Sequence, residues 1–441
     1  MVKIIVDYAF KNCQNSITSI SFEEDSKVIS IGSYSFYNAK IETANLSNCN
    51  KLTLLNESVF GYCRFLTLIL LPQNISSIGR DCFLWASSLQ SIDLPDSVET
   101  IYRAAFSYSG LTTIKISKTS KLSKLDSVCF TNTKLSSFFI LKYLKDLTFD
   151  SFDGCQYLEN ITLDPENQYY KFESKTLFSG ADNSTLFRVI NTYSESVYVV
   201  PPYVINISKN CFYKLKIKSI LLHNKITYIG KYAFYECKSL TSITLPENVI
   251  SIKDYTFQYC TSLTSVTLPK NLQNIDAAVF DGCTSLRSIV FPESLKIIEI
   301  WAFYQCTSLN NITFLNNSNS IIFGLNPFLD ILNPVNIYVP GMLKIIEGVP
   351  EVFPKGSHLY ITNQTILLSC VKYIFGEKFF HVHFDEPLKI SDKSTIDTII
   401  YISIEDLSFL QIKPKTIDDF IYDHGISAFL SSFIISIIPQ S

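Results

Sequence analysis

The sequence predicts a β-rich solenoid of short stacked repeats rather than a single compact core. Two neighbouring 23-residue segments align without a gap over residues 261–306. A phenylalanine preceded five residues earlier by an apolar residue recurs along most of the chain. Apolar residues also alternate with serine and threonine ahead of a proline in the best repeats. Each coil of such an array packs only on its neighbours, so 441 residues can fold without one large core.

The repeat follows the pattern L-x-x-I-x-L-P-x-x-L-x-x-I-x-x-x-x-F-x-x-C, with other apolar residues at some of the Ile and Leu positions. The first of the two aligned segments supplies the anchors Leu263, Val266, Leu268, Pro269, Leu272, Ile275, Phe280 and Cys283. The second supplies Leu286, Ile289, Phe291, Pro292, Leu295, Ile298, Phe303 and Cys306. This pattern is that of a leucine-rich-repeat solenoid.

The phenylalanine anchor can be followed through twelve copies, at Phe10, Phe36, Phe60, Phe83, Phe106, Phe130, Phe152, Phe212, Phe234, Phe257, Phe280 and Phe303. The apolar residue five positions earlier is, in the same order, Ile5, Ile31, Leu55, Ile78, Ile101, Leu125, Leu147, Ile207, Ile229, Ile252, Ile275 and Ile298. Twelve matches to a two-point rule are very unlikely to arise by chance.

Each part of the repeat predicts one part of a coil. Alternation of Ile and Leu with Ser and Thr predicts a strand with one buried and one solvent-facing side. Proline ends the strand because it cannot donate a ladder hydrogen bond. The chain then returns through the second apolar pair, and we expect the phenylalanine in a short helical or 3₁₀ turn. Stacked coils would form a parallel concave sheet on one side, with turns and loops on the convex side.

The cysteines follow the repeat and not a redox or zinc motif. Seven lie three residues after the phenylalanine, where other copies have Ala, Ser, Thr or Leu: Cys13, Cys63, Cys155, Cys237, Cys260, Cys283 and Cys306. A position that accepts such residues is small and buried, so we expect a ladder of reduced, buried thiols. Disulfides between stacked coils are the alternative, since coil spacing alone does not forbid them.

The repeat also suggests domain boundaries. An N-terminal repeat block covers residues 1–165, and a second block covers residues 201–350. Residues 166–200 interrupt the period and predict an enlarged coil with a β-hairpin, whose strands are Thr176–Phe178 and Thr185–Arg188. Residues 351–441 contain a degenerate repeat followed by an apolar segment without repeats, which we expect to cover the open end of the array.

Composition and motifs argue against several functions. A net charge of −3 gives no basic stripe for nucleic acid, and no apolar stretch is long enough for a membrane span. Motifs of nucleotide-binding, hydrolase and zinc enzymes are absent, so we expect no enzyme, no cofactor and no metal site. His381, His383 and Asp385 would share one face of a strand, which is compatible with a metal site. We favour the simpler interpretation that they are exposed residues of a strand. No signal peptide is visible, which places the chain in the cytoplasm if Met1 is the true start.

The outward positions of the predicted strands are the candidate binding surface. They form mostly uncharged rows of Ser and Thr with scattered apolar residues. The concave-face candidates are Leu70, Asp93, Lys115, Phe139, Thr162, Leu221, Thr244, Thr267, Val290 and Thr313. Such a surface suits a protein or glycan ligand, but Ser and Thr also merely suit an exposed sheet.

The run LTSITLPENVISIKDYTFQYC, the 23-residue period and the F-x-x-C step resemble the BspA-like surface antigens. The enlarged coil, which begins KTLFSGADNSTLFRV, is similar to a variant repeat of those proteins. The resemblance covers about residues 1–350. It implies a leucine-rich-repeat protein of the cell surface that binds host, matrix or cell partners without catalysis. An intracellular leucine-rich-repeat scaffold for protein–protein interaction is the alternative function.

Overall fold

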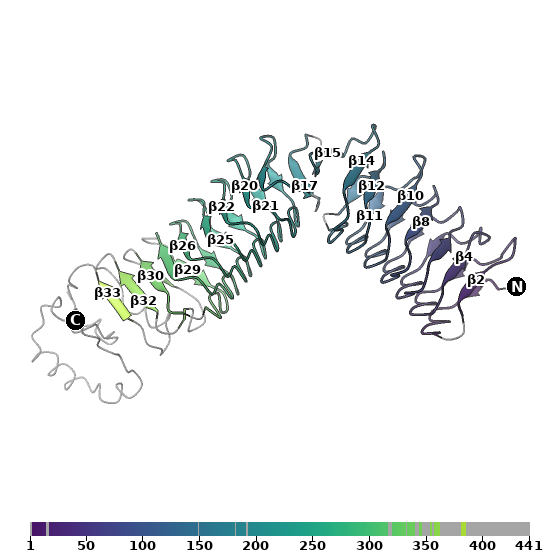
Figure 1. Cartoon of the computed structure of the whole chain (residues 1–441), viewed down its shortest axis with the longest axis horizontal. Coiled ribbons are helices and arrows are strands. Elements are labelled where there is room, and N and C mark those ends of the chain that lie inside the picture. The colour runs from purple at the N-terminus through teal and green to yellow at the C-terminus, as the bar shows by residue number, and fades with distance from the viewer. Residues whose placement is uncertain are drawn as a thin grey trace, which may run out of the picture. The chain divides into compact units, whose positions relative to one another are not determined.

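The computed structural model describes residues 2–331 except 15–16, 149, 181, 191–192 and 316–319, followed by the segments 333–339, 344–345, 353–354, 357–361 and 381–384. The chain divides into two compact units (Figure 1). Unit 1 comprises Met1–Tyr193 with Ser208–Tyr213, and unit 2 comprises Ser194–Ile207 with Lys214–Ser441. Most of the predicted cap at 351–441 lies outside the described residues.

Each regular coil of unit 1 contributes a longer and a shorter strand. The longer strands are β2 (Ser19–Ser21), β4 (Thr43–Asn45), β6 (Leu68–Leu70), β8 (Ser91–Leu94), β10 (Thr113–Ile116), β12 (Ser137–Ile140) and β14 (Asn160–Leu163). The two-residue strands are β1 (Ile4–Ile5), β3 (Ser30–Ile31), β5 (Leu54–Leu55), β7 (Ser77–Ile78), β9 (Thr100–Ile101), β11 (Lys124–Leu125) and β13 (Asp146–Leu147).

Unit 2 repeats this arrangement. Its first set of strands is β18 (Val197–Val199), β20 (Ser219–Leu221), β22 (Ser242–Thr244), β24 (Ser265–Thr267), β26 (Ser288–Phe291), β28 (Asn311–Phe314), β30 (Asn336–Val339), β32 (His358–Ile361) and β33 (His381–Phe384). Its second set is β19 (Asn206–Ile207), β21 (Tyr228–Ile229), β23 (Ser251–Ile252), β25 (Asn274–Ile275), β27 (Ile297–Ile298), β29 (Ser320–Phe323) and β31 (Lys344–Ile345).

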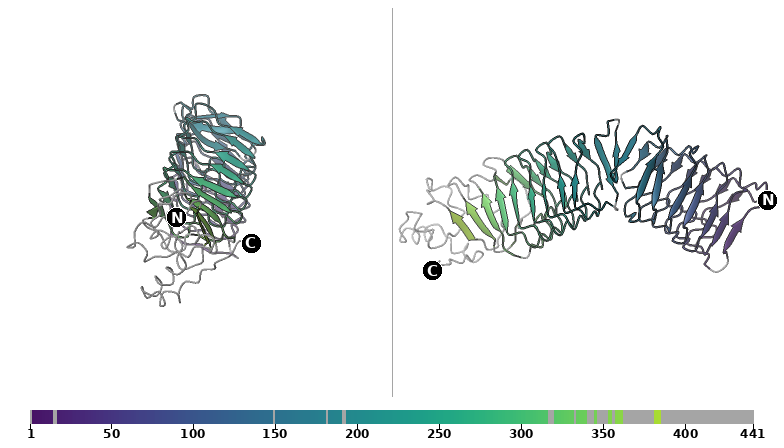
Figure 2. Two further views of the ribbon diagram at one scale, coloured as in Figure 1. Left: turned by 90° about the vertical axis from the view of Figure 1, so that its left-hand side faces the viewer. Right: turned by 45° about the horizontal axis from the view of Figure 1, so that its top comes forward.

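Strands of successive coils pair in parallel, with equivalent repeat positions in register (Figure 2). Ile92 faces Ile114, for example, and Ile289 faces Ile312. The second, two-residue strand is a feature that the sequence pattern did not predict. It contains the apolar residue that precedes the phenylalanine by five, and it forms its own parallel ladder. Coils within a unit are therefore joined along two ladders, which are interrupted between β6 and β8, β10 and β12, β20 and β22, and β24 and β26 on one side, and between β3 and β5 and between β21 and β23 on the other.

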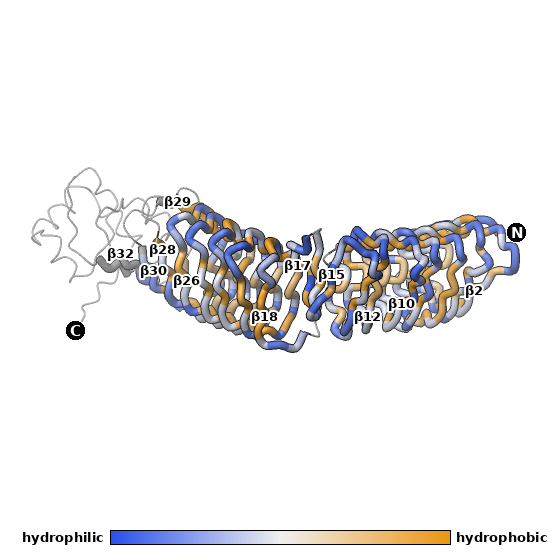
Figure 3. Tube along the Cα trace, turned by 90° about the horizontal axis from the view of Figure 1, so that it is seen from above, coloured by the Kyte–Doolittle hydropathy of each residue, from blue (hydrophilic) through white to orange (hydrophobic). Residues whose placement is uncertain are grey.

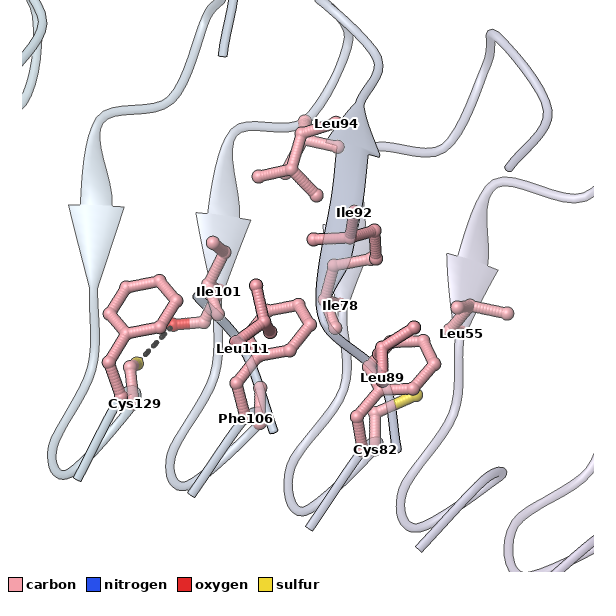
Figure 4. Close-up of a cluster of buried hydrophobic side chains, with 14 of the residues drawn as sticks. Leu55, Ile78, Cys82, Leu89, Ile92, Leu94, Ile101, Phe106, Leu111 and Cys129 are labelled. Carbon is pink, nitrogen blue, oxygen red and sulfur yellow. Dashed lines mark hydrogen bonds between the residues drawn. The ribbon is translucent and has the colours of Figure 1, made fainter. Parts of the chain in front are cut away.

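The core runs along each unit as rows of equivalent side chains. Figure 4 shows part of these rows in unit 1. Along the chain, apolar and polar residues alternate over short distances, which gives each coil both a core and a solvent side (Figure 3). In unit 1 the phenylalanine rings from Phe10 to Phe152 stack with centroids 5.1–5.8 Å apart. In unit 2 the stack continues past Phe303 to Phe328 and Phe353, two anchors that the sequence analysis missed.

The turn that holds the phenylalanine is not helical, which corrects the expected helical or 3₁₀ turn; the described residues contain no helix. The residues two before and two after the phenylalanine have left-handed backbones, as in Tyr255 and Tyr259, each with φ of 59°. The amides of Tyr255, Phe257 and Tyr259 donate to carbonyls of the next coil at 2.7–3.0 Å. The intervening amides donate within their own turn, so every amide from Tyr255 to Tyr259 is paired.

The predicted ladder of reduced cysteines is confirmed. All eleven described cysteines are free thiols, and all but Cys13 are buried. Cys63, Cys260, Cys283 and Cys306 each donate from Sγ to the carbonyl of the phenylalanine one coil earlier, at 2.9–3.2 Å. Burial raises the pKa of Cys155 to about 11 and that of Cys237 to about 12. These thiols therefore act as small apolar side chains with one weak hydrogen bond.

The enlarged coil forms an antiparallel meander of β15 (Tyr170–Glu173), β16 (Thr176–Ser179) and β17 (Thr185–Val189). Strands β16 and β17 occupy the two predicted hairpin segments, whereas β15 was not predicted. The side chain of Tyr170 supplies hydrogen bonds to β13 that a neighbouring strand would otherwise supply. Its hydroxyl accepts from the Leu147 amide at 3.1 Å and donates to the Lys145 carbonyl at 2.9 Å. Burial is the main cause that raises the pKa of Tyr170 to about 12.

A buried ion pair fixes β17 to the coil of Phe152. The guanidinium of Arg188 pairs with Oδ1 of Asp153 and donates to the Asn210 carbonyl at 2.8 Å. The Asn210 amide donates to Oδ2 of Asp153 at 2.6 Å, so both carboxylate oxygens are bonded. Arg188 also lies over the ring of Tyr213, 5.9 Å from its centroid. Hydrogen bonds to both carboxylate oxygens and the opposite charge of Arg188 are what make the burial of Asp153 tolerable.

Replacing Phe257 by alanine tests the ring stack. The side chain is fully buried, so we expect a cavity that lowers the free energy of unfolding by about 3–5 kcal/mol. Because coupling is between neighbours, hydrogen exchange should accelerate first in the coils of Phe234 and Phe280. Equal acceleration throughout unit 2 would contradict this coil-to-coil coupling.

Maleimide labelling of the folded protein at about pH 8 tests the thiol ladder. The thiolate is the reactive form, and a raised pKa together with burial should protect Cys237, Cys260, Cys283 and Cys306 until the protein unfolds. Cys13 is only half-buried and should label first, which makes it an internal control. Disulfide-linked peptides among the four cysteines in unreduced digests would refute the assignment.

The variant Tyr170→Phe tests how the meander is attached. It leaves the Leu147 amide and Lys145 carbonyl without their partner, so we expect a loss of about 1–3 kcal/mol in urea denaturation. The exposed neighbour Tyr169 provides the control, Tyr169→Phe, which should change stability little. Indistinguishable unfolding of the two variants would show that the hydroxyl of Tyr170 is not an anchor.

Candidate functional site

The candidate surface is the outward side of the longer strands. These strands alternate between exposed and buried residues, as in Ser242–Thr244, Ser265–Thr267 and Ser288–Phe291. All ten residues predicted for this face are exposed or half-buried in the structure. Five lie in unit 1 and five in unit 2, so the candidate set divides into two separate surfaces.

In unit 1, parallel pairing brings the predicted residues together two at a time. Lys115 lies beside Asp93, and its Nζ is 3.0 Å from a carboxylate oxygen of Asp93. Both side chains are about two-thirds exposed, at 66% and 69%, so the pair contributes little to stability. Phe139 pairs with Thr162 and is half-buried, which leaves part of its ring accessible. Leu70 is 42% exposed and pairs with a neighbouring Asn45.

In unit 2 the surface is uncharged. Thr244 pairs with Thr267, and Val290 pairs with Thr313. Leu221 pairs with Val199, a residue that the sequence analysis did not select. Leu221 is 55% exposed and Val199 is 62% exposed, so together they form an apolar patch. The repeat resumes in the sequence at Tyr198–Pro201, and the alternation V-Y-V-V-P at residues 197–201 is the signal that places Val199 on the outward side.

Other candidates from the sequence gain no support as chemical sites. Strand β33 contains His381 and His383, but their side chains and Asp385 lie outside the described residues. In the part of the chain that is described, no three or more His, Cys, Asp or Glu side chains group as a metal site would require. The same residues include no helix with the length and apolar character of a membrane span.

Comparison with known proteins decides the family. A model of the BspA type leucine rich repeat region matches residues 1–112, 76–192 and 205–330, with six copies. The chain belongs to this BspA-type leucine-rich-repeat family. The resemblance inferred from the F-x-x-C step and the 23-residue period is therefore confirmed, as is the leucine-rich-repeat fold. No curated protein matches the sequence of this BspA-type chain.

Solved structures of bacterial proteins share the fold of this BspA-type chain. A leucine rich cell surface protein of Faecalibacterium prausnitzii is 24% identical, with a TM-score of 0.53 over 72% of this chain and 84% of that chain. The pneumococcal vaccine antigen PcpA is 18% identical, with a TM-score of 0.56 over 84% of this chain and 90% of that chain. At these identities the likeness concerns the fold alone.

Proposed function

We propose that this BspA-type repeat protein is a non-enzymatic adhesion or recognition protein of a cell surface. It would hold a protein or glycan partner on the outward side of its longer strands. The observation that supports this most is the in-register row of exposed, mostly uncharged residues, with Leu221, Val199 and Val290 as apolar contacts. The names of the similar bacterial proteins, a cell surface protein and a vaccine antigen, favour a surface location.

The physical character of this face suits a protein partner. Its residues sit on hydrogen-bonded strands, so few side chains and little backbone must be ordered on binding. Exposed apolar side chains can become buried contacts, whereas the hydroxyls of Thr244 and Thr267 can form hydrogen bonds at the rim. Because the face of unit 2 is uncharged, affinity should depend only weakly on salt.

Arginine substitutions on the face test this proposal. The intact chain is immobilised and exposed to extracts of surface and cytosolic proteins, and the captured partners are identified. Ser265→Arg with Thr267→Arg should lose those partners, because both side chains are exposed and the added bulk and charge would block docking. Thermal unfolding should stay close to that of the unaltered protein.

The matched control is Asp182→Arg, an exposed position in the turn of the meander. It should retain the partners of the unaltered chain. If the control loses them and the strand-face variant keeps them, the enlarged coil is the recognition element and the strand face is not. Partners captured only from cytosolic extract would favour an intracellular scaffold over a surface protein.

A further inference from the structure

Two coils carry an aspartate directly after the phenylalanine anchor. Asp153 follows Phe152 in unit 1, and Asp281 follows Phe280 in unit 2. Both are buried, with exposed fractions of only 9% and 6%. A buried carboxylate needs hydrogen-bond donors to both of its oxygens, and a cationic donor offsets the cost of removing its charge from water. The two aspartates can therefore be compared at the same repeat position.

The environment of Asp153 is complete. One oxygen accepts from a side-chain amide, that of Asn210 at 2.6 Å, and the other pairs with the guanidinium of Arg188. The same guanidinium lies over the ring of Tyr213, which directly follows the next phenylalanine anchor, Phe212. The enlarged coil supplies this arginine from β17. Asp153 thus shows how a guanidinium is bound at this position of the repeat.

Asp281 also accepts from a side-chain amide, but this amide comes from the preceding coil and no guanidinium pairs with the carboxylate. Its Oδ2 accepts from the side-chain amide of Gln258 at 2.5 Å. Its Oδ1 is buried and has no hydrogen-bond partner among the described residues. The next phenylalanine anchor, Phe303, is again followed by a tyrosine, Tyr304. A hydrogen bond and a charge from Asp330 are the main causes that raise the pKa of Tyr304, and burial and the charge of Asp281 add to them.

Small residues lie on either side of Asp281 in its own turn, and a tyrosine of the preceding coil covers one of them. Its coil has Ala278 and Gly282 where the flanking coils have Tyr255 with Tyr259 and Trp301 with Gln305. A Cβ on Gly282 would lie 2.4 Å from Cδ1 of Tyr259, so the tyrosine ring occupies the space that the glycine leaves. Tyr259 is 37% exposed, so this ring lies at the surface beside Asp281. The charge of Asp281 is also the largest cause of the raised pKa of Tyr259.

We propose that Asp281 is a docking site for the arginine side chain of a partner protein. The guanidinium would donate to Oδ1 of Asp281 and stack on the ring of Tyr304, as Arg188 does with Asp153 and Tyr213. Arginine suits the site better than lysine because its planar cation stacks on aromatic rings and loses its hydration more easily.

The arginine must come from outside the chain. The chain has five arginines, all among the described residues, and none of them donates a hydrogen bond to Oδ1 of Asp281. The site lies in the phenylalanine turn and not on a longer strand, so it does not depend on the strand-face function proposed above. Failure of either proposal leaves the other intact.

Calorimetric titration of the intact chain with N-acetyl-arginine amide tests the site. We expect saturable binding that Asp281→Asn weakens about tenfold or more, because the variant removes a charge-assisted hydrogen bond but keeps the shape of the side chain. N-acetyl-lysine amide should bind more weakly than the arginine compound. The control Asp276→Asn removes a carboxylate of the same unit that pairs with Lys253 at 3.5 Å, and it should not alter binding.

A second variant keeps the test decisive if Asp281→Asn does not fold. Tyr304→Leu removes the proposed stacking ring and should weaken arginine binding while the melting temperature stays close to that of the unaltered protein. Absence of saturable arginine binding to the unaltered chain would overturn the proposal. So would equal affinity of the unaltered chain and a folded Asp281→Asn variant.

Discussion

The structure depends on one constraint: no coil can bury its own core, and each must use the next coil to do so. A single phenylalanine ring such as Phe257 has a core neighbour on either side only because Phe234 and Phe280 stack on it. The coil of Phe280 accepts the backbone amides of this turn, and the coil of Phe257 in the same way accepts those of the turn of Phe234. The rings leave water and the amides find their acceptors in the same step, when two coils pack together. Stability therefore arises at each interface between neighbouring coils and not within a single coil.

The left-handed turn follows from this constraint. A helical turn would direct all of its amides along its own axis and leave none for the neighbouring coil. Alternating left-handed residues direct every second amide toward the next coil instead. Bulky residues such as Tyr255 and Trp301 adopt this unfavourable backbone at φ near 60° because the surrounding hydrogen bonds and ring contacts hold them there.

Much of the fold was predictable because it depends on which residue types recur at which positions of the repeat. The pairing of Phe280 with Ile275, and the small slot at Cys283, are visible as residue types at fixed spacing. The short strands and left-handed turns were not predictable, because they depend on where backbone amides point, which no residue type records. Phe328 was missed since the period lengthens from 23 to 25 residues after Phe303. The alternation of residues along each strand predicted which residues point outward. The pairing of Asp153 with Arg188 was not predictable, because the two residues are separated by the inserted meander and no repeat position links them.

Neighbour-only bonding within a unit also determines how such a protein would respond to a pulling force. Tension applied along the chain loads the two ladders and the turn bonds of the outermost coil, while inner coils keep both of their interfaces. Coils should then detach singly from an end, each releasing 23 residues, or roughly 80 Å of extended chain. A protein held at two points would lengthen in steps and dissipate work at each one, so that a bound partner experiences a limited load.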